Sequence, residues 1–329
     1  MTQLKRIALI TTGGTIAGVS PDDTATARYQ INTDGQTLVD AIPALNELAH
    51  IEIHSLLQID SSTITAAQQV EIVNAARQLL TRSDIDALVI THGTDSLVET
   101  ATLLQFCLKS SKPVVLVGAM RPASALSADG PLNLYQAVLV ATHADAHNLG
   151  VLVVMQDNIH SARFVRKSHS SKPDAFTSPD TGPLGVICDG IIYIGCTPRR
   201  AHTTHSPFSL SAGDILPAVD IIYDHPNANP ALYQASKASQ RAGVVIAGMG
   251  NGHLSAAARA GAIELRAAGI PVIRASQNHS GPVVPADLDH ELGTFAAHWW
   301  SPNGARILLS LCLLEGYSAA QIRHALQHY

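Results

Sequence analysis

The sequence predicts an α/β protein built of two doubly wound, mostly parallel sheets, a larger N-terminal one and a smaller C-terminal one. Short β-branched runs alternate with longer runs of helical periodicity. The predicted strands are apolar throughout, which is typical of parallel sheets covered by helices on both faces. The chain has 329 residues, enough for about two domains at ~150 residues each.

The larger domain is expected over residues 1–196. Its parallel strands are predicted at 4–11, 51–57, 87–91, 114–118 and 150–155. Helical spacing occupies 65–83, 97–109 and 132–144. A further apolar run at 186–194 is interrupted by Asp189-Gly190, a dipeptide that favours a two-residue hairpin. We therefore expect an antiparallel hairpin to close this domain.

The segment 197–213 is polar, contains two prolines and lacks periodicity, so it is the expected linker. The smaller domain follows over 214–329. Its strands are predicted at 219–223, 243–247 and 271–275, and its helices at 231–242, 254–268 and 305–327. Alternation on this scale predicts a second parallel sheet.

The composition excludes several classes of protein. Charged residues make up 14% and hydrophobic residues 46%, which argues against a disordered chain. The formal net charge is −5, and the sequence contains no cluster of Lys and Arg residues. Neither nucleic acid nor an anionic membrane is therefore an expected partner. No apolar run approaches the ~20 residues that a membrane span needs.

The N-terminal apolar run, 7–10, is too short for a signal peptide, so a cytoplasmic location is expected. A trimmed mature chain, as in a periplasmic protein, would look much the same. The cysteines are expected to be reduced, small core residues without a disulfide framework. They are Cys107, Cys188, Cys196 and Cys312.

Polar loops follow three of the predicted strands, where ligands bind in open parallel sheets. The first loop contains Thr12, Gly13 and Gly14. Adjacent glycines allow a sharp turn, and its spacing fits neither a dinucleotide fingerprint nor a P-loop. A plain turn is the ordinary interpretation. The alternative is that the Thr12 hydroxyl is a nucleophile beside exposed backbone amides.

The second loop, Thr91-His92-Gly93-Thr94-Asp95-Ser96, opens a predicted helix. Ser96 and Glu99 fit a capping box, which gives Ser96 a purely structural role. Asp95 could hold an ammonium group, while Thr94 and the helix N-terminus could hold a carboxylate. Together these groups match the head of an α-amino acid.

The third loop carries Ser61 and Ser62, hydroxyls that could complete a carboxylate cradle, before Thr65, an expected N-cap. Metal binding is not expected, because the i,i+4 histidine pairs lack the Glu of an H-E-x-x-H motif. These pairs are His50/His54, His143/His147 and His324/His328. The glycine-rich run at 248–253 resembles a dinucleotide loop only superficially, so no cofactor is expected.

Taken together, the segments 12–18 and 91–96 resemble the two signatures of the bacterial-type L-asparaginase/glutaminase family. A third similarity covers 117–122, 127–131 and 133–134, and the resemblance runs through essentially the whole chain. It implies cofactor-free hydrolysis of L-asparagine to L-aspartate and ammonia through a threonine acyl-enzyme, with a secondary L-glutaminase activity open. It also implies a homotetramer of intimate dimers whose active sites are shared between subunits.

The resemblance also implies site residues. Thr12 is matched to the nucleophile, Tyr29 to a flap tyrosine that helps to activate it, and Thr94, Asp95 and Lys167 to the second catalytic group. Substrate binding falls to Ser61, Ser62, Thr94 and Asp95. Without the resemblance, Lys167 would be interpreted as a surface lysine and Tyr29 as a packed aromatic residue. Residues 12–29 are expected to form a closing flap that brings Tyr29 to Thr12.

Some positions depart from the family pattern. Ser62 replaces a Gln or Glu, and His253 replaces an Asn or Ser. The neighbouring subunit's acidic residue is not clearly aligned; Asp287 is our first candidate and Asp289 the second. Two other functions stay open: a subunit acting on a larger amide such as a glutaminyl-tRNA, which the charge disfavours, and a non-catalytic amino-acid-binding protein.

Overall fold

A computed structural model describes residues 4–329, and its larger sheet confirms the predicted fold class. The strand order is β12-β11-β8-β7-β6-β5-β1-β4. The parallel strands are β1 (Lys5–Gly13), β4 (Ala49–Ile59), β5 (Ala87–Thr91), β6 (Val114–Val117) and β7 (Val151–Met155). The antiparallel strands are β8 (Asn158–Ser161), β11 (Gly185–Cys188) and β12 (Ile191–Ile194). The hairpin predicted at Asp189-Gly190 is confirmed, since it joins β11 to β12.

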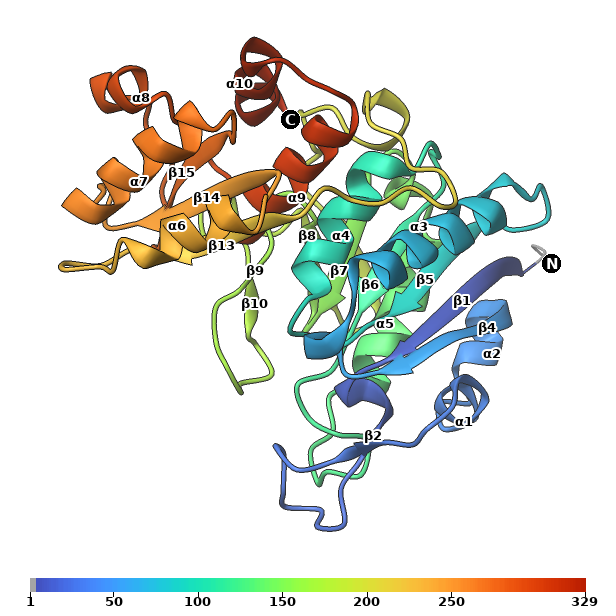
Figure 1. Cartoon of the computed structure of the whole chain (residues 1–329). Coiled ribbons are helices and arrows are strands. Elements are labelled where there is room, and N and C mark those ends of the chain that lie inside the picture. Colours follow the sequence, from blue (N-terminus) through green and yellow to red (C-terminus); the bar gives the residue numbers. More distant parts are fainter. Residues whose placement is uncertain (1–3) are drawn as a thin grey trace. The chain divides into compact units, whose positions relative to one another are not determined.

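Helices cover both faces of this sheet because its central strands are apolar on both sides. The predicted helices are confirmed as α3 (Ala66–Thr81), α4 (Leu97–Cys107) and α5 (Gly130–Thr142). In Figure 1, α3 and α4 lie side by side over one face and α5 over the other. Two short helices, α1 (Gly35–Asp40) and α2 (Leu45–Leu48), were not predicted.

Single turns of 3-10 helix occur at η1 (Thr15–Ala17), η2 (Ser61–Thr63), η3 (Ala144–Ala146) and η4 (Thr203–His205); η1 and η2 follow strands β1 and β4, whereas η3 follows helix α5. Two small antiparallel pairs were also not predicted. They are β2 (Gly18–Val19) with β3 (Gln30–Ile31), and β9 (Arg166–Lys167) with β10 (Phe176–Thr177). The first pair brackets residues 20–29, and the second carries Lys167. Both pairs project from the large sheet (Figure 1).

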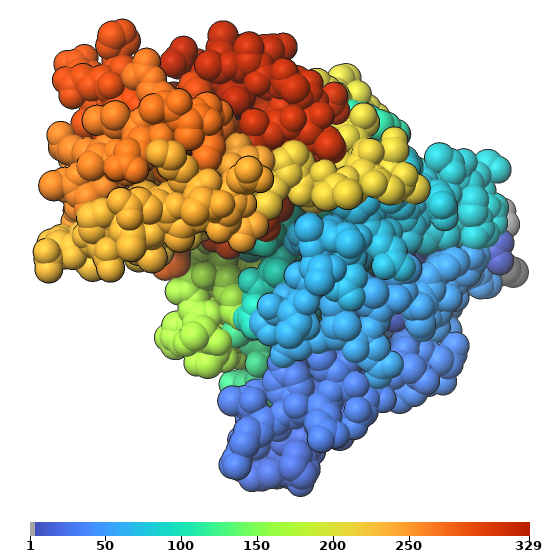
Figure 2. Space-filling view, viewed as in Figure 1, coloured from blue at the N-terminus to red at the C-terminus, as the bar shows by residue number. Residues whose placement is uncertain are grey.

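Residues 20–29 form a surface loop that contacts a second loop, 121–129. The backbone N–H of Ala123 donates to the Gly18 carbonyl at 2.8 Å, and that of Leu126 donates to the Asp23 carbonyl at 3.0 Å. The two loops, dark blue and green, lie side by side in Figure 1. In the space-filling view the dark-blue residues lie at the surface (Figure 2). The loop is therefore held at its ends by the β2–β3 pair and, at Asp23, by the loop 121–129.

The chain divides into two compact units after Asp214, and residues 197–213 belong to the first. Within this segment Phe208 is fully buried and packs edge-on against Phe106 of α4, with 5.5 Å between ring centroids. Leu210 is also fully buried. The segment expected as a linker is thus packed against the larger unit over much of its length; the expected domain boundaries stay predictions.

The second unit has a smaller parallel sheet of order β13-β14-β15-β16. Its strands are β13 (Val219–Tyr223), β14 (Gly243–Gly248), β15 (Val272–Ser276) and β16 (Phe295–Ala296). Its helices are α6 (Ala231–Ala238), α7 (Ala256–Ala267), α8 (Asp287–Leu292), α9 (Pro302–Leu314) and α10 (Ala319–His328). Tyr233, Val244 and Leu265 are among the residues that form its core.

The single helix predicted at 305–327 is wrong, because the chain breaks there into α9 and α10. Gly316 takes a positive φ of 67°, a conformation that ends helices readily at glycine. Ser318 then starts α10 with a capping box completed by Gln321. The apolar periodicity continues across the break, which is why it suggested one helix.

Several smaller expectations also need correction. Cys188 and Cys196 are exposed rather than in the core, whereas Cys107 and Cys312 are buried. His50 and His54 lie on strand β4, so their helical spacing has no meaning there. His324 and His328 do share helix α10, with 4.3 Å between ring centroids. Among residues 4–329, none of the helices combines the length and apolar character that crossing a bilayer requires.

Candidate active site

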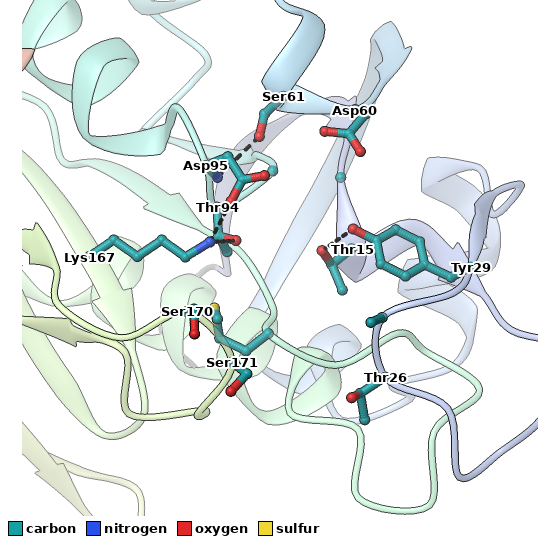
Figure 3. A pocket seen from close by; sticks show the side chains of 14 residues that line it. Thr15, Thr26, Tyr29, Asp60, Ser61, Thr94, Asp95, Lys167, Ser170 and Ser171 are labelled. Carbon is teal, nitrogen blue, oxygen red and sulfur yellow. Dashed lines mark hydrogen bonds and ion pairs between the residues drawn. The ribbon is translucent and has the colours of Figure 1, made fainter.

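A cavity of about 190 Å³ lies at the carboxyl ends of β5, β1 and β4, which are neighbours in the sheet. The three polar loops singled out in the sequence meet there, as expected for ends of adjacent parallel strands. It is small beside the ~300–1,000 Å³ of drug-sized sites, so it suits a ligand the size of an amino acid. Its lining is Gly14, Thr15, Thr26, Ala27, Tyr29, Asp60, Ser61, Gly93, Thr94, Asp95, Met120, Lys167, Ser170 and Ser171 (Figure 3).

On one side of the cavity, the hydroxyls of Thr15 and Tyr29 are hydrogen-bonded at 2.7 Å (Figure 3). Thr15 begins the turn η1 directly after the two glycines and is 7% exposed. The ring of Tyr29 lies against Gly18, where a Cβ atom would come within 2.6 Å of it. Gly18 therefore leaves the room that the aromatic ring needs to reach Thr15.

Thr12 does not line this cavity, contrary to the sequence expectation. It lies within β1, is 2% exposed, and donates its hydroxyl proton to the Thr91 carbonyl at 2.8 Å. Tyr29 meets Thr15, not Thr12. The Gly14 N–H, expected to face a ligand, donates instead to the Ile59 carbonyl at 3.0 Å. The hydroxyl that the cavity uses is thus three residues further along the same segment.

On the opposite side, Lys167 joins the second loop. Its ammonium donates to Thr94 Oγ1 at 2.9 Å and to Asp95 Oδ1 at 2.5 Å (Figure 3). Thr94 is buried, whereas the Asp95 side chain is 58% exposed and the Lys167 side chain 20% exposed. Lys167 comes from β9, so the small β9–β10 pair positions it beside two residues far away in the sequence. The structure thus brings together three of the expected residues.

Ser61 ties the second loop to the third. Its hydroxyl accepts a hydrogen bond from the Asp95 N–H at 3.2 Å, and its carbonyl accepts one from the Ser96 hydroxyl at 2.7 Å. The predicted capping box at Ser96 is therefore wrong: Ser96 makes no side-chain cap bond because its hydroxyl is used across the loops. The N-cap predicted at Thr65 is confirmed, with Gln68 completing a capping box.

Ser62 does not line the cavity. The turn η2 starts at Ser61, which buries Ser61 to 4% exposure and leaves Ser62 exposed at the surface. Asp60, which was not among the predicted residues, does line the cavity. Its position immediately before Ser61 was the available signal.

Other lining residues were missed because they follow no recognisable pattern. Thr26 and Ala27 come from the surface loop, and Met120 from the loop after β6. Ser170 and Ser171 come from the connection between β9 and β10, below Lys167 in the view of Figure 3. The surface loop and the β9–β10 connection follow short strands that were not predicted, so loop positions alone did not identify their residues.

The two acidic candidates in the second unit differ in their surroundings. Asp289 is paired with the buried Arg274 at 2.6 Å and accepts a hydrogen bond from Thr294. Burial alone would raise the pKa of Asp289, but the hydrogen bonds from Arg274 and Thr294 hold it below its ordinary value. Asp287 is exposed at the start of α8. Asp289 therefore has a structural use, and Asp287 stays available as a ligand-binding residue.

Within residues 4–329, no three His, Cys, Asp or Glu side chains lie close enough together to hold a metal ion. The buried His92 pairs its Nδ1 with the Gly93 carbonyl at 2.7 Å, and burial lowers the pKa of His92 to about 4. His92 is therefore uncharged near neutral pH and stabilises the loop that carries Thr94.

Family models match both compact units of the chain. Residues 6–198 match the model described as "Asparaginase, N-terminal", and residues 218–326 match "Glutaminase/Asparaginase C-terminal domain". The chain belongs to the asparaginase family. Both models together cover most of the chain, so the asparaginase fold accounts for both compact units.

Individual asparaginases are similar over their whole length. The chain is 38% identical to L-asparaginase 2 of Bacillus subtilis, covering 99% of this chain and 87% of that protein. It is 36% identical to a glutaminase-asparaginase of Pseudomonas fluorescens, covering 100% and 91%. A crystal structure of a probable cytoplasmic L-asparaginase from Campylobacter jejuni superposes with a TM-score of 0.96 at 39% identity, covering 99% of this chain and 100% of the other.

Proposed function

We propose that this protein hydrolyses L-asparagine to L-aspartate and ammonia through an acyl-enzyme on Thr15. The observation that carries the proposal is that one amino-acid-sized cavity holds two threonine hydroxyls, each hydrogen-bonded to a side chain that can exchange a proton. Thr15 is bonded to Tyr29 at 2.7 Å, and Thr94 to Lys167 at 2.9 Å. The choice of L-asparagine as the substrate is supported by the relatives called L-asparaginase.

In the first half of the reaction Thr15 attacks the side-chain amide carbonyl of asparagine. A threonine hydroxyl barely ionises at neutral pH, so attack requires a base within hydrogen-bond reach, and Tyr29 is in that position. An ester forms between Thr15 Oγ1 and the substrate carbonyl carbon, and the C–N bond breaks. The amide nitrogen leaves as ammonia after gaining the proton that Thr15 loses.

In the second half a water molecule attacks the ester and releases aspartate. The Thr94–Lys167–Asp95 group faces the cavity and is our candidate for activating that water, because a hydroxyl bonded to an amine can relay a proton. Asp95 holds the Lys167 ammonium beside Thr94, and a bound substrate ammonium would give the Asp95 carboxylate a second partner.

The α-amino-acid head fits the side of the cavity formed by Ser61 and Asp95. Ser61 and the backbone around Gly93 offer hydrogen bonds to the carboxylate, and Asp95 offers a charge to the ammonium. Loop 20–29 would cover the bound substrate and exclude bulk water, since Tyr29, Thr26 and Ala27 all come from it. The nucleophile that this closing loop serves is Thr15 rather than Thr12.

L-Glutamine is a second candidate substrate, favoured by relatives called glutaminase-asparaginase. The two substrates differ by one methylene, which a pocket discriminates by only ~1–3 kcal/mol. Secondary glutaminase activity therefore belongs to the proposal.

The quaternary arrangement is also proposed: a homotetramer of intimate dimers, in which Asp287 of a neighbouring subunit completes the site. The exposure of Asp287 supports this choice over Asp289, whose carboxylate is bound to Arg274. Sedimentation analysis tests the tetramer, and Asp287→Asn tests the shared site. A cytoplasmic location is proposed with it, supported by the similar Campylobacter jejuni protein, which is called cytoplasmic; a relative from Haemophilus influenzae is called periplasmic, so cell fractionation decides.

The direct test of function is ammonia release from L-asparagine and L-glutamine, measured side by side at low substrate concentration. We expect asparagine to be hydrolysed, with glutamine slower. Mass spectrometry of protein quenched during turnover should place the ester on the peptide that contains Thr15. Tight asparagine binding without ammonia release would instead identify a binding protein, and an adduct on another residue would overturn the mechanism.

A further inference from the structure

Asp60, which was not among the predicted site residues, lines the cavity with a carboxylate. It follows strand β4, immediately before Ser61, and is exposed toward the cavity that it lines. In the view of Figure 3 its carboxylate lies between Ser61 and the ring of Tyr29. It is thus on the same side of the cavity as the groups proposed to hold the substrate head.

The charges around the cavity leave Asp60 unneutralised. The lining contains two carboxylates, Asp60 and Asp95, and one ammonium, Lys167. Lys167 is paired with Asp95 at 2.5 Å. Over the described range, 4–329, Asp60 takes part in no ion pair. Because Lys167 neutralises Asp95 in part, Asp60 is the lining group best able to attract a positive charge from a ligand.

The position expected to contact the substrate head does not reach it. Ser62 is exposed and does not line the cavity. Asp60 lies two residues earlier in the same turn and does line it. We propose that Asp60 binds the α-ammonium group of the substrate and thereby makes the site selective for α-amino acids. This inference rests on the proposed function and names a further substrate-binding residue for it.

Asp60 also has a structural use that the test must separate. Its Oδ1 accepts a hydrogen bond from the Ser62 N–H at 2.8 Å, which shapes the turn η2. Asn keeps an oxygen in that place and removes only the charge, whereas Ala removes both. Asp60→Asn is therefore the informative variant, and Asp60→Ala reports the contribution of the turn.

The experiment measures binding of L-aspartate and succinate, which differ only in the α-ammonium group, to the full-length protein by calorimetry. In wild-type protein we expect aspartate to bind more tightly than succinate. In Asp60→Asn the aspartate dissociation constant and the asparagine KM should rise roughly 10- to 100-fold, the range of a hydrogen bond to a charged group. Succinate binding should stay the same or improve, because a negative charge near its carboxylates has been removed.

Asp145→Asn is the matched control, since it removes one negative charge from a side chain that is 74% exposed on η3, which contributes nothing to the cavity lining. It should leave both ligands unaffected. The assignment would be overturned if Asp60→Asn bound aspartate as tightly as wild-type protein does. It would also be overturned if only Asp60→Ala changed ligand binding. Failure of the proposed function looks different: wild-type protein would then release no ammonia from asparagine, whatever residue 60 is.

Discussion

The backbone of Gly14 lies against that of Gly93, so that a Cβ atom built on Gly14 would stand 2.3 Å from the Gly93 Cα. This approach brings the loop after β1 and the loop after β5 together, and with them Thr15 and Thr94. Gly14 also has a φ of 80°, a conformation that side chains other than glycine adopt at a cost. The spacing of the two proposed catalytic hydroxyls thus depends on the absence of two side chains.

We predict that Gly14→Ala abolishes most of the activity, because the new methyl group must push the two loops apart. A displacement of about 1 Å in an active site can cost ~100-fold in rate. Gly190→Ala is the control: Gly190 has a φ of 74° but open space around it, so it bears the backbone cost alone. Thermal unfolding and ammonia release from both variants measure the difference. Equal activity in the two would contradict the role given to the contact.

The sequence predicted most of the strands and the three loops because alternating apolar runs and polar strand ends are local signals. It placed the expected nucleophile at Thr12, which does not line the cavity, because the end of β1 is not a local property. We expected the strand to end at residue 11, which would place Thr12 in the loop, but it reaches Gly13. Thr12 therefore stays inside the sheet, at an irregularity in the pairing with β4, and Thr15 is the first hydroxyl beyond the glycines.

The remaining site residues could not be predicted from local patterns for a related reason. Positions 61 and 62 are both serine, so the sequence alone does not distinguish them. The turn η2 buries Ser61 and leaves Ser62 exposed. Lys167 reaches Thr94 across 73 positions because a two-residue strand pair positions it, and strands that short leave no periodicity to detect. Both choices depend on tertiary packing.

The distinction between the two threonines gives a paired prediction. Thr15→Val keeps the branched shape, and we expect it to lower kcat about a thousandfold or more, as loss of a nucleophile does, with little change in the melting temperature. Thr12→Val leaves the Thr91 carbonyl without its bond from the hydroxyl, so it should cost about 1–2 kcal/mol of stability and leave kcat within a few fold. Ammonia release and thermal unfolding of both variants check this. The opposite pattern would identify Thr12, and not Thr15, as the nucleophile.

Ser96 should act on substrate binding through Ser61. Removing its hydroxyl in Ser96→Ala breaks the 2.7 Å bond to the Ser61 carbonyl and loosens the turn that holds the Ser61 side chain in the cavity. We expect the asparagine KM to rise more than kcat falls, with a stability loss of about 1 kcal/mol. Ser96→Thr, which retains the hydroxyl, should recover the wild-type KM. If the alanine variant changes only the melting temperature, Ser96 is a structural residue alone.

Two buried histidines make the stability depend on pH. Burial lowers the pKa of His92 and of His160 to about 4, whereas an unfolded histidine titrates near ~6.5. Between these values the unfolded chain binds more protons than the folded chain. The contribution of the two neutral histidines to the free energy of unfolding is therefore fully present above pH ~6.5 and decreases as the pH drops toward 4.

His160 tests this dependence away from the cavity. The ring is 2% exposed, with its Nδ1 bonded to Ser178 Oγ at 2.9 Å. Asn can make that bond but cannot titrate, so His160→Asn should be less stable than wild type at pH 7 and yet lose less stability between pH 7 and pH 5. In that range each buried histidine removes at most about 1.36 kcal/mol of stability for every pH unit below the pKa of the unfolded chain. Denaturant unfolding at the two pH values measures the slope; parallel slopes for variant and wild type would mean that His160 takes up its proton in the folded protein as readily as in the unfolded chain.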